Sequence, residues 1–198
     1  MNQRTLALFD FDGTITSRDT LPEFIIFAKG WIRFALGTAL LSPILALFKA
    51  GAIPAWRAKE ALMTLFFGGM NEHEFQAVCD RFSTDRIPTL VRAAAIKRIT
   101  DHQRCGHRVV VVSASPENWV GRWAETNGLE WIATRMDCLN GRITGKISGK
   151  NCQGMEKVFR IKNYLDLTNY TRIYAYGDSQ GDMPLLRLGT CAYYRPFR

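Results

Sequence analysis

Leu6-Ala7-Leu8-Phe9-Asp10-Phe11-Asp12-Gly13-Thr14 is the stretch on which the interpretation of the whole chain depends. Its apolar first half predicts a short buried strand, and two aspartates separated by one residue follow that strand directly. Buried carboxylates are costly unless they are paired or bound to a metal ion. Ligands of open α/β sheets bind at the carboxyl ends of the strands, so Asp10 and Asp12 lie where a site is expected.

Both carboxylates can face one cavity, because the backbone turns just after the strand ends. Asp10 is then a candidate nucleophile, since aspartyl-phosphates are a known covalent route. Asp12 is a candidate donor of a proton to the leaving oxygen. The alternative interpretation is that Asp12-Gly13 is simply a turn with polar neighbours. Whether the stretch is a catalytic site or only a turn depends on the residues found in the rest of the chain.

The composition suits one globular domain, or a domain with an insertion. The chain has 198 residues, of which 47% are hydrophobic and 22% are charged, so it can bury a sizeable core. Its net charge of +8 permits nucleic acid, an anionic membrane surface or anionic small substrates as partners. The basic residues are scattered rather than clustered, and most of them therefore predict a solvated surface.

A cytoplasmic location is expected from the cysteines and from the first residues. The five cysteines include no CxxC pair, which indicates neither a disulfide framework nor a zinc site and fits a reducing compartment. Residues 1–4 lead directly into the first predicted strand and do not resemble a signal peptide.

Strands and helices alternate after residue 107, which is typical of a parallel α/β sheet. Strands are predicted at residues 5–9, 107–113, 131–134, 172–176 and 190–194, with a hairpin turn at Asn140-Gly141. Helices are predicted at residues 54–67, 71–84, 88–105, 116–127, 154–165 and 183–188. The expected α/β fold has a Rossmann-like parallel sheet core formed by residues 1–16 plus 91–198, with residues 17–90 inserted as a helical cap.

Residues 24–53 are unusually apolar, and Trp31–Phe48 contains a single charge, Arg33. A membrane span needs about 20 apolar residues, and a single crossing would put Asp10 and the later motifs on opposite sides of the membrane. Two interpretations remain open: a buried helical hairpin bent near Pro43, or a hairpin that enters the membrane interface. Cations suited to anionic lipid on the cytoplasmic face of a membrane flank the apolar part at Lys29, Arg33, Lys49, Arg57 and Lys59.

Polar residues suited to phosphate chemistry follow later elements. Ser113 ends the valine-rich strand, where its hydroxyl and the N–H groups of the next turn can hold phosphate oxygens, although helix capping would explain it equally well. Lys157 lies near a helix N-terminus, where a cation is mildly unfavourable. Its position suggests that it neutralises a phosphoryl group, and a solvent-exposed lysine is the alternative.

Asp178 and Asp182 follow a strand and predict, together with Asp10, a Mg²⁺ site. Mg²⁺ prefers one or two carboxylates together with water and substrate phosphate, and Asp10 and Asp178 can supply them if their strands are neighbours. Asp182 would then orient the metal-bound waters or Lys157 from outside the ligand set. Each residue has an ordinary explanation alone, but together they provide a nucleophile, a metal site, phosphate ligands and a proton donor.

The chain resembles the haloacid dehalogenase (HAD) superfamily phosphatases, whose four motifs occur here in order. They match Asp10-Phe11-Asp12-Gly13-Thr14, Ser113, Lys157 and Gly177-Asp178 to Asp182, and a cap between the first two motifs is similar to subfamily IB. The resemblance implies that Asp10 attacks phosphorus and that Asp12 acts as acid and base. It also implies phosphate binding by Ser113 and Lys157, and a Mg²⁺ ion held by Asp10, Asp178 and the Asp12 backbone carbonyl.

The resemblance leaves the substrate open between small and amphiphilic phosphomonoesters. Phosphoserine phosphatases bind the substrate amine with a cap glutamate, and the nearest match here is the shorter Asp19. Their second motif reads Ser-Gly-Gly, whereas this chain has Ser113-Ala114-Ser115, whose side chains take up room. The apolar segment after the first motif is similar to that of phosphatidylglycerophosphate phosphatases and favours a lipid phosphate.

Two other functions compete with hydrolysis. A basic nucleic-acid-binding protein with a silent phosphatase fold is disfavoured, because no catalytic position is lost and no cluster of basic and aromatic residues follows one element. A phosphotransferase with a second alcohol as acceptor would use the same residues, so the sequence does not separate it from a hydrolase.

Overall fold

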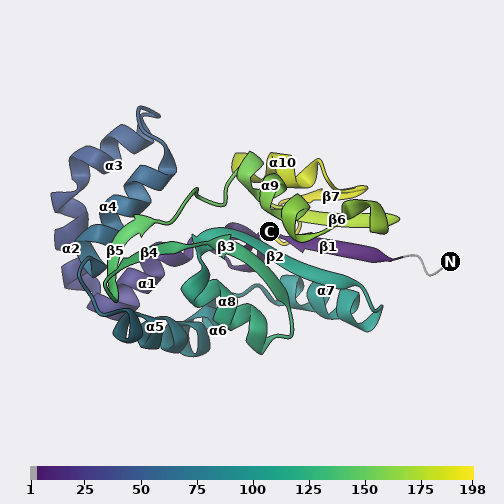
Figure 1. Cartoon of the computed structure of the whole chain (residues 1–198), viewed down its shortest axis with the longest axis horizontal. Helices are drawn as coiled ribbons and strands as arrows, with labels where there is room; N and C mark the ends of the chain where they lie inside the picture. The colour runs from purple at the N-terminus through teal and green to yellow at the C-terminus, as the bar shows by residue number, and fades with distance from the viewer. Residues whose placement is uncertain (1–3) are drawn as a thin grey trace.

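Five parallel strands form the central sheet of the computed structural model, which describes residues 4–198 (Figure 1). Their order is β3-β2-β1-β6-β7, so β1 lies in the middle and pairs with β2 and β6. The strands span Thr5–Phe9 (β1), Arg108–Pro116 (β2), Glu130–Thr134 (β3), Arg172–Gly177 (β6) and Cys191–Tyr194 (β7). The predicted Rossmann-like α/β core is therefore confirmed.

Alternate residues of the central strands pack on opposite faces of the sheet, as expected for strands that are covered on both sides. Leu6 and Leu8 join one apolar cluster, and Ala7 and Phe9 join another. The first face is covered by α9 (Met155–Tyr164) and α10 (Met183–Leu186), and the second by α7 (Ala93–Arg104) and α8 (Glu117–Thr126). Because both faces of the strands are apolar, the polar site residues gather beyond the strand ends.

A helical segment is inserted between β1 and α7. Its outgoing and returning connections run side by side: Thr16 and Val91 form an antiparallel bridge, and the Arg92 N–H donates to the Ile15 carbonyl at 2.8 Å. The inserted helices are α1 (Thr20–Lys29), α2 (Trp31–Leu40), α3 (Ser42–Lys49), α4 (Ala55–Phe67), α5 (Glu72–Arg81) and α6 (Ile87–Leu90).

The single helix predicted over residues 88–105 is wrong, because the structure has two helices there. α6 ends at Leu90 and α7 begins at Ala93. The backbone of Val91 and Arg92 pairs with the outgoing connection instead of continuing the helix. The local sequence favours a helix, but the return of the chain to the sheet overrides that preference. The other predicted helices are observed with ends within three residues of the prediction.

The hairpin turn predicted at Asn140-Gly141 is confirmed. It joins β4 (Met136–Leu139) to β5 (Arg142–Ile147) in an antiparallel pair that lies outside the main sheet. Both turn residues have positive φ angles, 51° and 71°, which Asn and Gly tolerate better than other residues. β5 packs against α4 and so connects the hairpin to the inserted helices.

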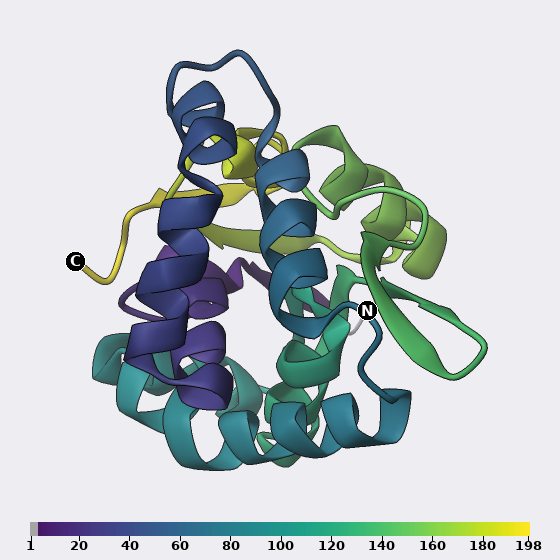
Figure 2. The ribbon, with the colours of Figure 1, turned by 90° about the vertical axis from the view of Figure 1, so that its left-hand side faces the viewer.

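The buried hairpin, one of the two predictions for residues 24–53, is wrong. α2 and α3 are bent by 71° relative to each other, and the chain then turns back along them in α4 (Figure 2). The inner side of α2 packs on α4, where Gly37 leaves the room that the Phe66 ring takes up. The outer side is open, with Ile32 75% and Leu36 67% exposed. Within residues 4–198 no single helix has the length and apolar composition of a membrane span. The bent pair of α2 and α3 reaches that length and composition only when the two helices are counted together.

His102 of α7 is a buried histidine that links the helix to the back of the sheet. Its Nδ1 lies 2.8 Å from Nδ1 of His107, and its Nε2 lies 2.9 Å from the Tyr176 hydroxyl. Burial lowers the pKa of His102 to about 4, and the neighbouring His107 adds to the shift. The folded protein therefore favours the neutral imidazole.

We expect acid to destabilise the protein through His102. The pKa of His102 is lower in the folded chain than its ordinary value of 6.5, so its contribution to stability is complete above about pH 6.5 and is lost as the pH falls toward about 4. At about pH 5 the loss is roughly 2 kcal/mol. Urea unfolding at about pH 7 and about pH 5 measures it, and His102→Gln should flatten the difference. An equally steep pH dependence in the variant would remove His102 as the cause.

Candidate active site

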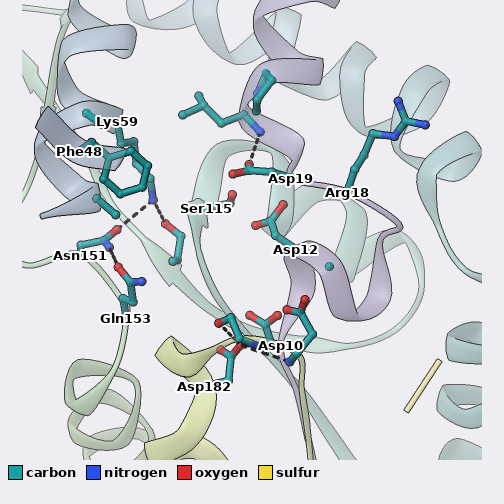
Figure 3. Close-up of a pocket in the computed structure, with 18 of the residues that line it drawn as sticks. Asp10, Asp12, Arg18, Asp19, Phe48, Lys59, Ser115, Asn151, Gln153 and Asp182 are labelled. Atoms are coloured by element: carbon teal, nitrogen blue, oxygen red, sulfur yellow. Dashed lines mark hydrogen bonds between the residues drawn. The ribbon is translucent and has the colours of Figure 1, made fainter. Parts of the chain in front are cut away.

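A cavity of about 550 Å³ lies beyond the carboxyl end of β1, between the sheet and the inserted helices. Figure 3 shows Asp10 and Asp182 together at one end of the site, with Asp19 and Lys59 farther along it. The sheet thus supplies the charged floor. The inserted helices supply a mainly apolar wall formed by Leu21, Pro22, Leu45, Phe48, Ala58 and Leu62.

Asp10 is the first residue after β1 and is 5% exposed. Its backbone N–H donates to the Tyr176 carbonyl of β6 at 2.9 Å, so the sheet fixes its position. Oδ2 accepts from the Thr14 hydroxyl at 2.9 Å, and Oδ1 accepts from Lys157 Nζ at 2.6 Å. Burial raises the pKa of Asp10 to about 7, although Lys157 opposes the rise.

Lys157 is 1% exposed, so the alternative of a solvent-exposed lysine is wrong. Its Nζ donates to Oδ1 of Asp10 and, at 2.7 Å, to Oδ1 of Asp182. Burial disfavours the charged ammonium, but the two carboxylates outweigh burial and raise the pKa of Lys157. The ammonium is therefore charged and held beside the candidate nucleophile.

Asp178 and Asp182 lie on the turn that follows β6. Oδ2 of Asp182 accepts from the N–H and the hydroxyl of Ser179, at 3.0 and 2.6 Å, and Asp178 accepts from the side chain of Arg198. Burial raises the pKa of Asp178, with a further contribution from Asp182. Gly13 has a φ angle of 78°, and a Cβ there would lie 2.5 Å from Oδ2 of Asp178, so the turn after β1 requires a glycine.

The acidic residues fit a hard divalent cation such as Mg²⁺. Carboxylate oxygens of Asp10, Asp178 and Asp182 lie within 4.8 Å of one another, and oxygen is the ligand that Mg²⁺ prefers. Lys157 contacts Asp10 and Asp182, and Arg198 contacts Asp178, so the carboxylates of this cluster already lie beside cations. Asp182 also lies in this cluster and accepts from Lys157 at 2.7 Å, which fits its predicted role of orienting that lysine. Its place outside the ligand set and the predicted Asp12 backbone ligand both stay predictions.

Asp12 is oriented by the first residue of α1. Its Oδ1 accepts from the Thr20 N–H at 2.8 Å and from the Thr20 hydroxyl at 2.6 Å. Its Oδ2 lies 3.5 Å from the hydroxyl of Ser113. One carboxylate oxygen is thus fixed by the inserted segment, while the other is less constrained and suited to carry a proton.

Ser113 is fully buried within β2, three residues before the strand ends at Pro116, and next to the cavity wall. Its Oγ accepts from the N–H of Ser115 at 2.9 Å and faces Asp12. The wall itself is formed at this point by Ala114 and Ser115. The predicted phosphate contact of Ser113 therefore stays a prediction.

Asp19 and Lys59 place opposite charges on the side of the inserted helices. Asp19 caps α1 by accepting from the Leu21 N–H at 2.9 Å, and burial, with Asp12 nearby, raises its pKa to about 6. Lys59 donates to the Ala114 carbonyl and, at 3.0 Å, to Oδ1 of Asn151, and burial lowers its pKa.

Lys59 was missed as a site residue by the sequence analysis, which grouped it with the cations beside the apolar segment. That grouping is wrong, because Lys59 lines the cavity. The available signal was its helical spacing. Ala55 and Leu62 lie four residues before and three residues after it, and both also line the cavity.

Comparison with known proteins agrees with this geometry. A family model described as haloacid dehalogenase-like hydrolase matches residues 7–187. Protein CicA of Caulobacter vibrioides is 31% identical over 195 residues, which cover 98% of this chain and 86% of that protein. A probable phosphatase of Mycobacterium tuberculosis is 30% identical over 202 residues, which cover 98% of this chain and 70% of that protein.

A solved structure also resembles the fold of this chain. The crystal structure of a Bordetella pertussis protein of unknown function matches with a TM-score of 0.83 at 25% identity, covering 96% of this chain and 88% of that one. The likeness therefore includes the inserted helices as well as the sheet.

Proposed function

The chain belongs to the haloacid dehalogenase-like hydrolases, and we propose that within this family it is a Mg²⁺-dependent phosphomonoesterase with Asp10 as its nucleophile. The observation that carries the proposal is the buried contact of Asp10 with Lys157, beside an acidic cluster suited to Mg²⁺. Positive charge around the phosphoryl oxygens is the main requirement of phosphoryl transfer. The probable phosphatase of Mycobacterium tuberculosis among its relatives supports phosphomonoester hydrolysis.

The first step forms a bond between a carboxylate oxygen of Asp10 and phosphorus, while the bond from phosphorus to the leaving oxygen breaks. Asp12 donates a proton to that oxygen, so that an alcohol leaves. In the second step water attacks the aspartyl-phosphate at phosphorus, and Asp12 accepts a proton from the water. The bond to Asp10 then breaks and inorganic phosphate is released.

The residues around this pair position it and neutralise charge. Lys157 holds Asp10 at 2.6 Å and offers positive charge to the phosphoryl oxygens, while Asp182 anchors Lys157 at 2.7 Å. We assign phosphate binding to the hydroxyl of Ser113 as well. Mg²⁺ held by Asp10 and Asp178 would supply further positive charge at the phosphoryl group and keep the nucleophile ionised.

The leaving group faces the inserted helices. Asp19 and Lys59 offer one negative and one positive group, while Leu45 and Phe48 offer an apolar wall. An organic phosphomonoester with both polar and apolar parts fits these surroundings, and the cavity has the size of ordinary small-molecule sites.

A lipid phosphate such as phosphatidylglycerophosphate is the second candidate. It is favoured by Phe48, which lines the cavity and is also 40% exposed at the molecular surface. Phosphoserine suits Asp19 and Lys59, whose charges complement its amine and carboxylate, but it leaves the apolar wall without a contact. Use of the apolar wall in binding therefore distinguishes a lipid phosphate from phosphoserine as the substrate.

Phosphate release from O-phosphoserine and from phosphatidylglycerophosphate in mixed micelles tests the proposal, with Asp10→Asn as the blank. Preference for the lipid would assign the apolar wall to substrate binding, and preference for phosphoserine would assign recognition to Asp19 and Lys59. No release above the blank from either compound or from p-nitrophenyl phosphate would contradict phosphomonoester hydrolysis.

Removal of Mg²⁺ with EDTA should abolish phosphate release, and added Mg²⁺ should restore it. Asp178→Asn should raise the Mg²⁺ concentration that gives half-maximal activity by at least about tenfold, because a neutral amide oxygen is a weaker ligand than a carboxylate. A Mg²⁺ titration of the initial rate measures this shift. Asp85→Asn, at an exposed acid that does not line the cavity, is the control, and an unchanged titration in Asp178→Asn would remove Asp178 from the metal site.

A further inference from the structure

The outer side of α2 and α3 is an exposed apolar surface that the proposed chemistry does not use. We define it as the α2–α3 face by Trp31, Ile32, Leu36, Leu40 and Leu47, whose exposed fractions are 65%, 75%, 67%, 70% and 48%. Ile32, Leu36 and Leu40 are spaced by four residues and therefore form one stripe along α2. In Figure 1 both helices lie at the edge of the molecule, at the end opposite the N-terminus.

The charges of the segment that carries the α2–α3 face have one sign. Residues 24–59 contain no aspartate or glutamate, while Arg33, Lys49 and Arg57 are exposed within them. The acids that flank this segment in the sequence have partners elsewhere: Glu23 pairs with Arg18 and Arg86, and Glu60 accepts from the Ile147 N–H at 2.9 Å. An apolar stripe bordered by cations complements a partner surface that combines negatively charged groups with an apolar layer beneath them.

We propose that the α2–α3 face binds the surface of a lipid bilayer that contains anionic lipids. Exposed apolar patches of this kind mark interaction sites, and a helix with apolar and cationic sides suits the interface between headgroups and acyl chains. Trp31 at the start of α2 is a residue type that prefers this interface.

The geometry supports contact with the interface rather than a crossing. α2 has 10 residues, which at about 1.5 Å per residue is roughly half the thickness of the hydrocarbon core of a bilayer. The inner sides of α2 and α3 pack on α1 and α4, so lipid can cover only their outer sides. Phe48 of α3 also lines the catalytic cavity, which therefore lies close to the proposed contact.

Flotation with vesicles tests this proposal without measuring turnover. The wild type should float with vesicles of equal parts phosphatidylcholine and phosphatidylglycerol, and bind more weakly to vesicles of phosphatidylcholine alone. Ile32→Gln combined with Leu36→Gln should weaken binding at least about tenfold, because two exposed apolar side chains lose their burial in lipid. Arg33→Gln should weaken binding to the anionic vesicles about fivefold.

The matched control changes two similarly exposed residues on α9, a helix that packs on the sheet. Met155 and Phe159 of α9 are also spaced by four residues and are 69% and 59% exposed. Met155→Gln combined with Phe159→Gln should float like the wild type. Because glutamine is a good helix former, all of these variants should keep their helices, which circular dichroism verifies.

Three results would overturn the proposal. The first is a wild type that floats with neither vesicle, and the second is equal binding by the Ile32→Gln/Leu36→Gln variant. The third is a wild-type dimer that the same variant dissociates and that does not float, which would make the face a contact between two copies. Asp10→Asn should float like the wild type, so failure of the catalytic proposal and failure of this one are distinguishable.

Discussion

Asp10→Asn should lower kcat/KM at least about 10⁴-fold for every phosphomonoester, while the protein stays folded. The amide has the size of the carboxylate but is not a nucleophile toward phosphorus, so no covalent intermediate forms. Stability should not fall, because burial already raises the pKa of Asp10 to about 7, which means that its charge is poorly accommodated in the absence of metal. Steady-state phosphate release and thermal unfolding measure the two effects.

A chemical control completes this prediction. Wild type quenched with acid during turnover should carry phosphate on the peptide that contains Asp10, and the variant should carry none. Asp10→Ala guards against slow deamidation of the introduced asparagine, which would restore the native residue. Activity of the alanine variant within about a hundredfold of the wild type would exclude Asp10 as the nucleophile.

The sheet could be predicted from the sequence because local pattern and tertiary environment agree there. Strands buried on both faces must be apolar along their whole length, and polar residues then appear where a strand ends. Asp10 and Asp182 are predicted for this reason, whereas Lys157 is predicted because a cation near a helix N-terminus is unfavourable. The structure brings the three together at distances of 2.6 and 2.7 Å. The interruption of the helix at Val91 could not be predicted, because its cause is a backbone contact with Thr16, 75 residues earlier.

The inserted helices were harder to predict because composition does not say which side of a helix is covered. The apolar residues of α2 and α3 suit a core equally well, and their exposure follows from packing against α1 and α4 alone. Lys59 was missed for the same reason, since its partners Ala114 and Asn151 come from the sheet domain, 55 and 92 residues away. Residues whose contacts join the inserted helices to the sheet cannot be recognised from the sequence around them.

Thr20 and Lys59 show how the inserted segment and the sheet depend on each other. Thr20 begins α1 and donates two hydrogen bonds to Asp12, while its hydroxyl also accepts from the Trp119 indole N–H at 3.1 Å. Asp12, to which we assign the proton transfer, is thus held by the first turn of the inserted segment. A substrate that changes the position of α1 would therefore change the orientation of Asp12, which connects substrate binding with proton transfer.

Asp12→Asn should separate the two chemical steps when the leaving group needs no proton. The asparagine oxygen can still accept both hydrogen bonds from Thr20, so the site keeps its shape. With p-nitrophenyl phosphate the nitrophenolate leaves unaided, and the aspartyl-phosphate on Asp10 forms. Water then has no base, so the intermediate accumulates and steady-state turnover falls about 10²- to 10⁴-fold.

Stopped-flow absorbance should therefore show a burst of one nitrophenolate per active site in the Asp12→Asn variant, followed by a slow phase. An alkyl phosphate, whose alkoxide does need the proton, should give no burst, and Asp10→Asn should give none with either substrate. The burst requires the Asp10 nucleophile, and its slow second phase reports the loss of the Asp12 base. The traces of Asp12→Asn and Asp10→Asn with p-nitrophenyl phosphate therefore test both assigned roles. Steady turnover without a burst, at a rate within about tenfold of the wild type, would show that another group transfers the proton.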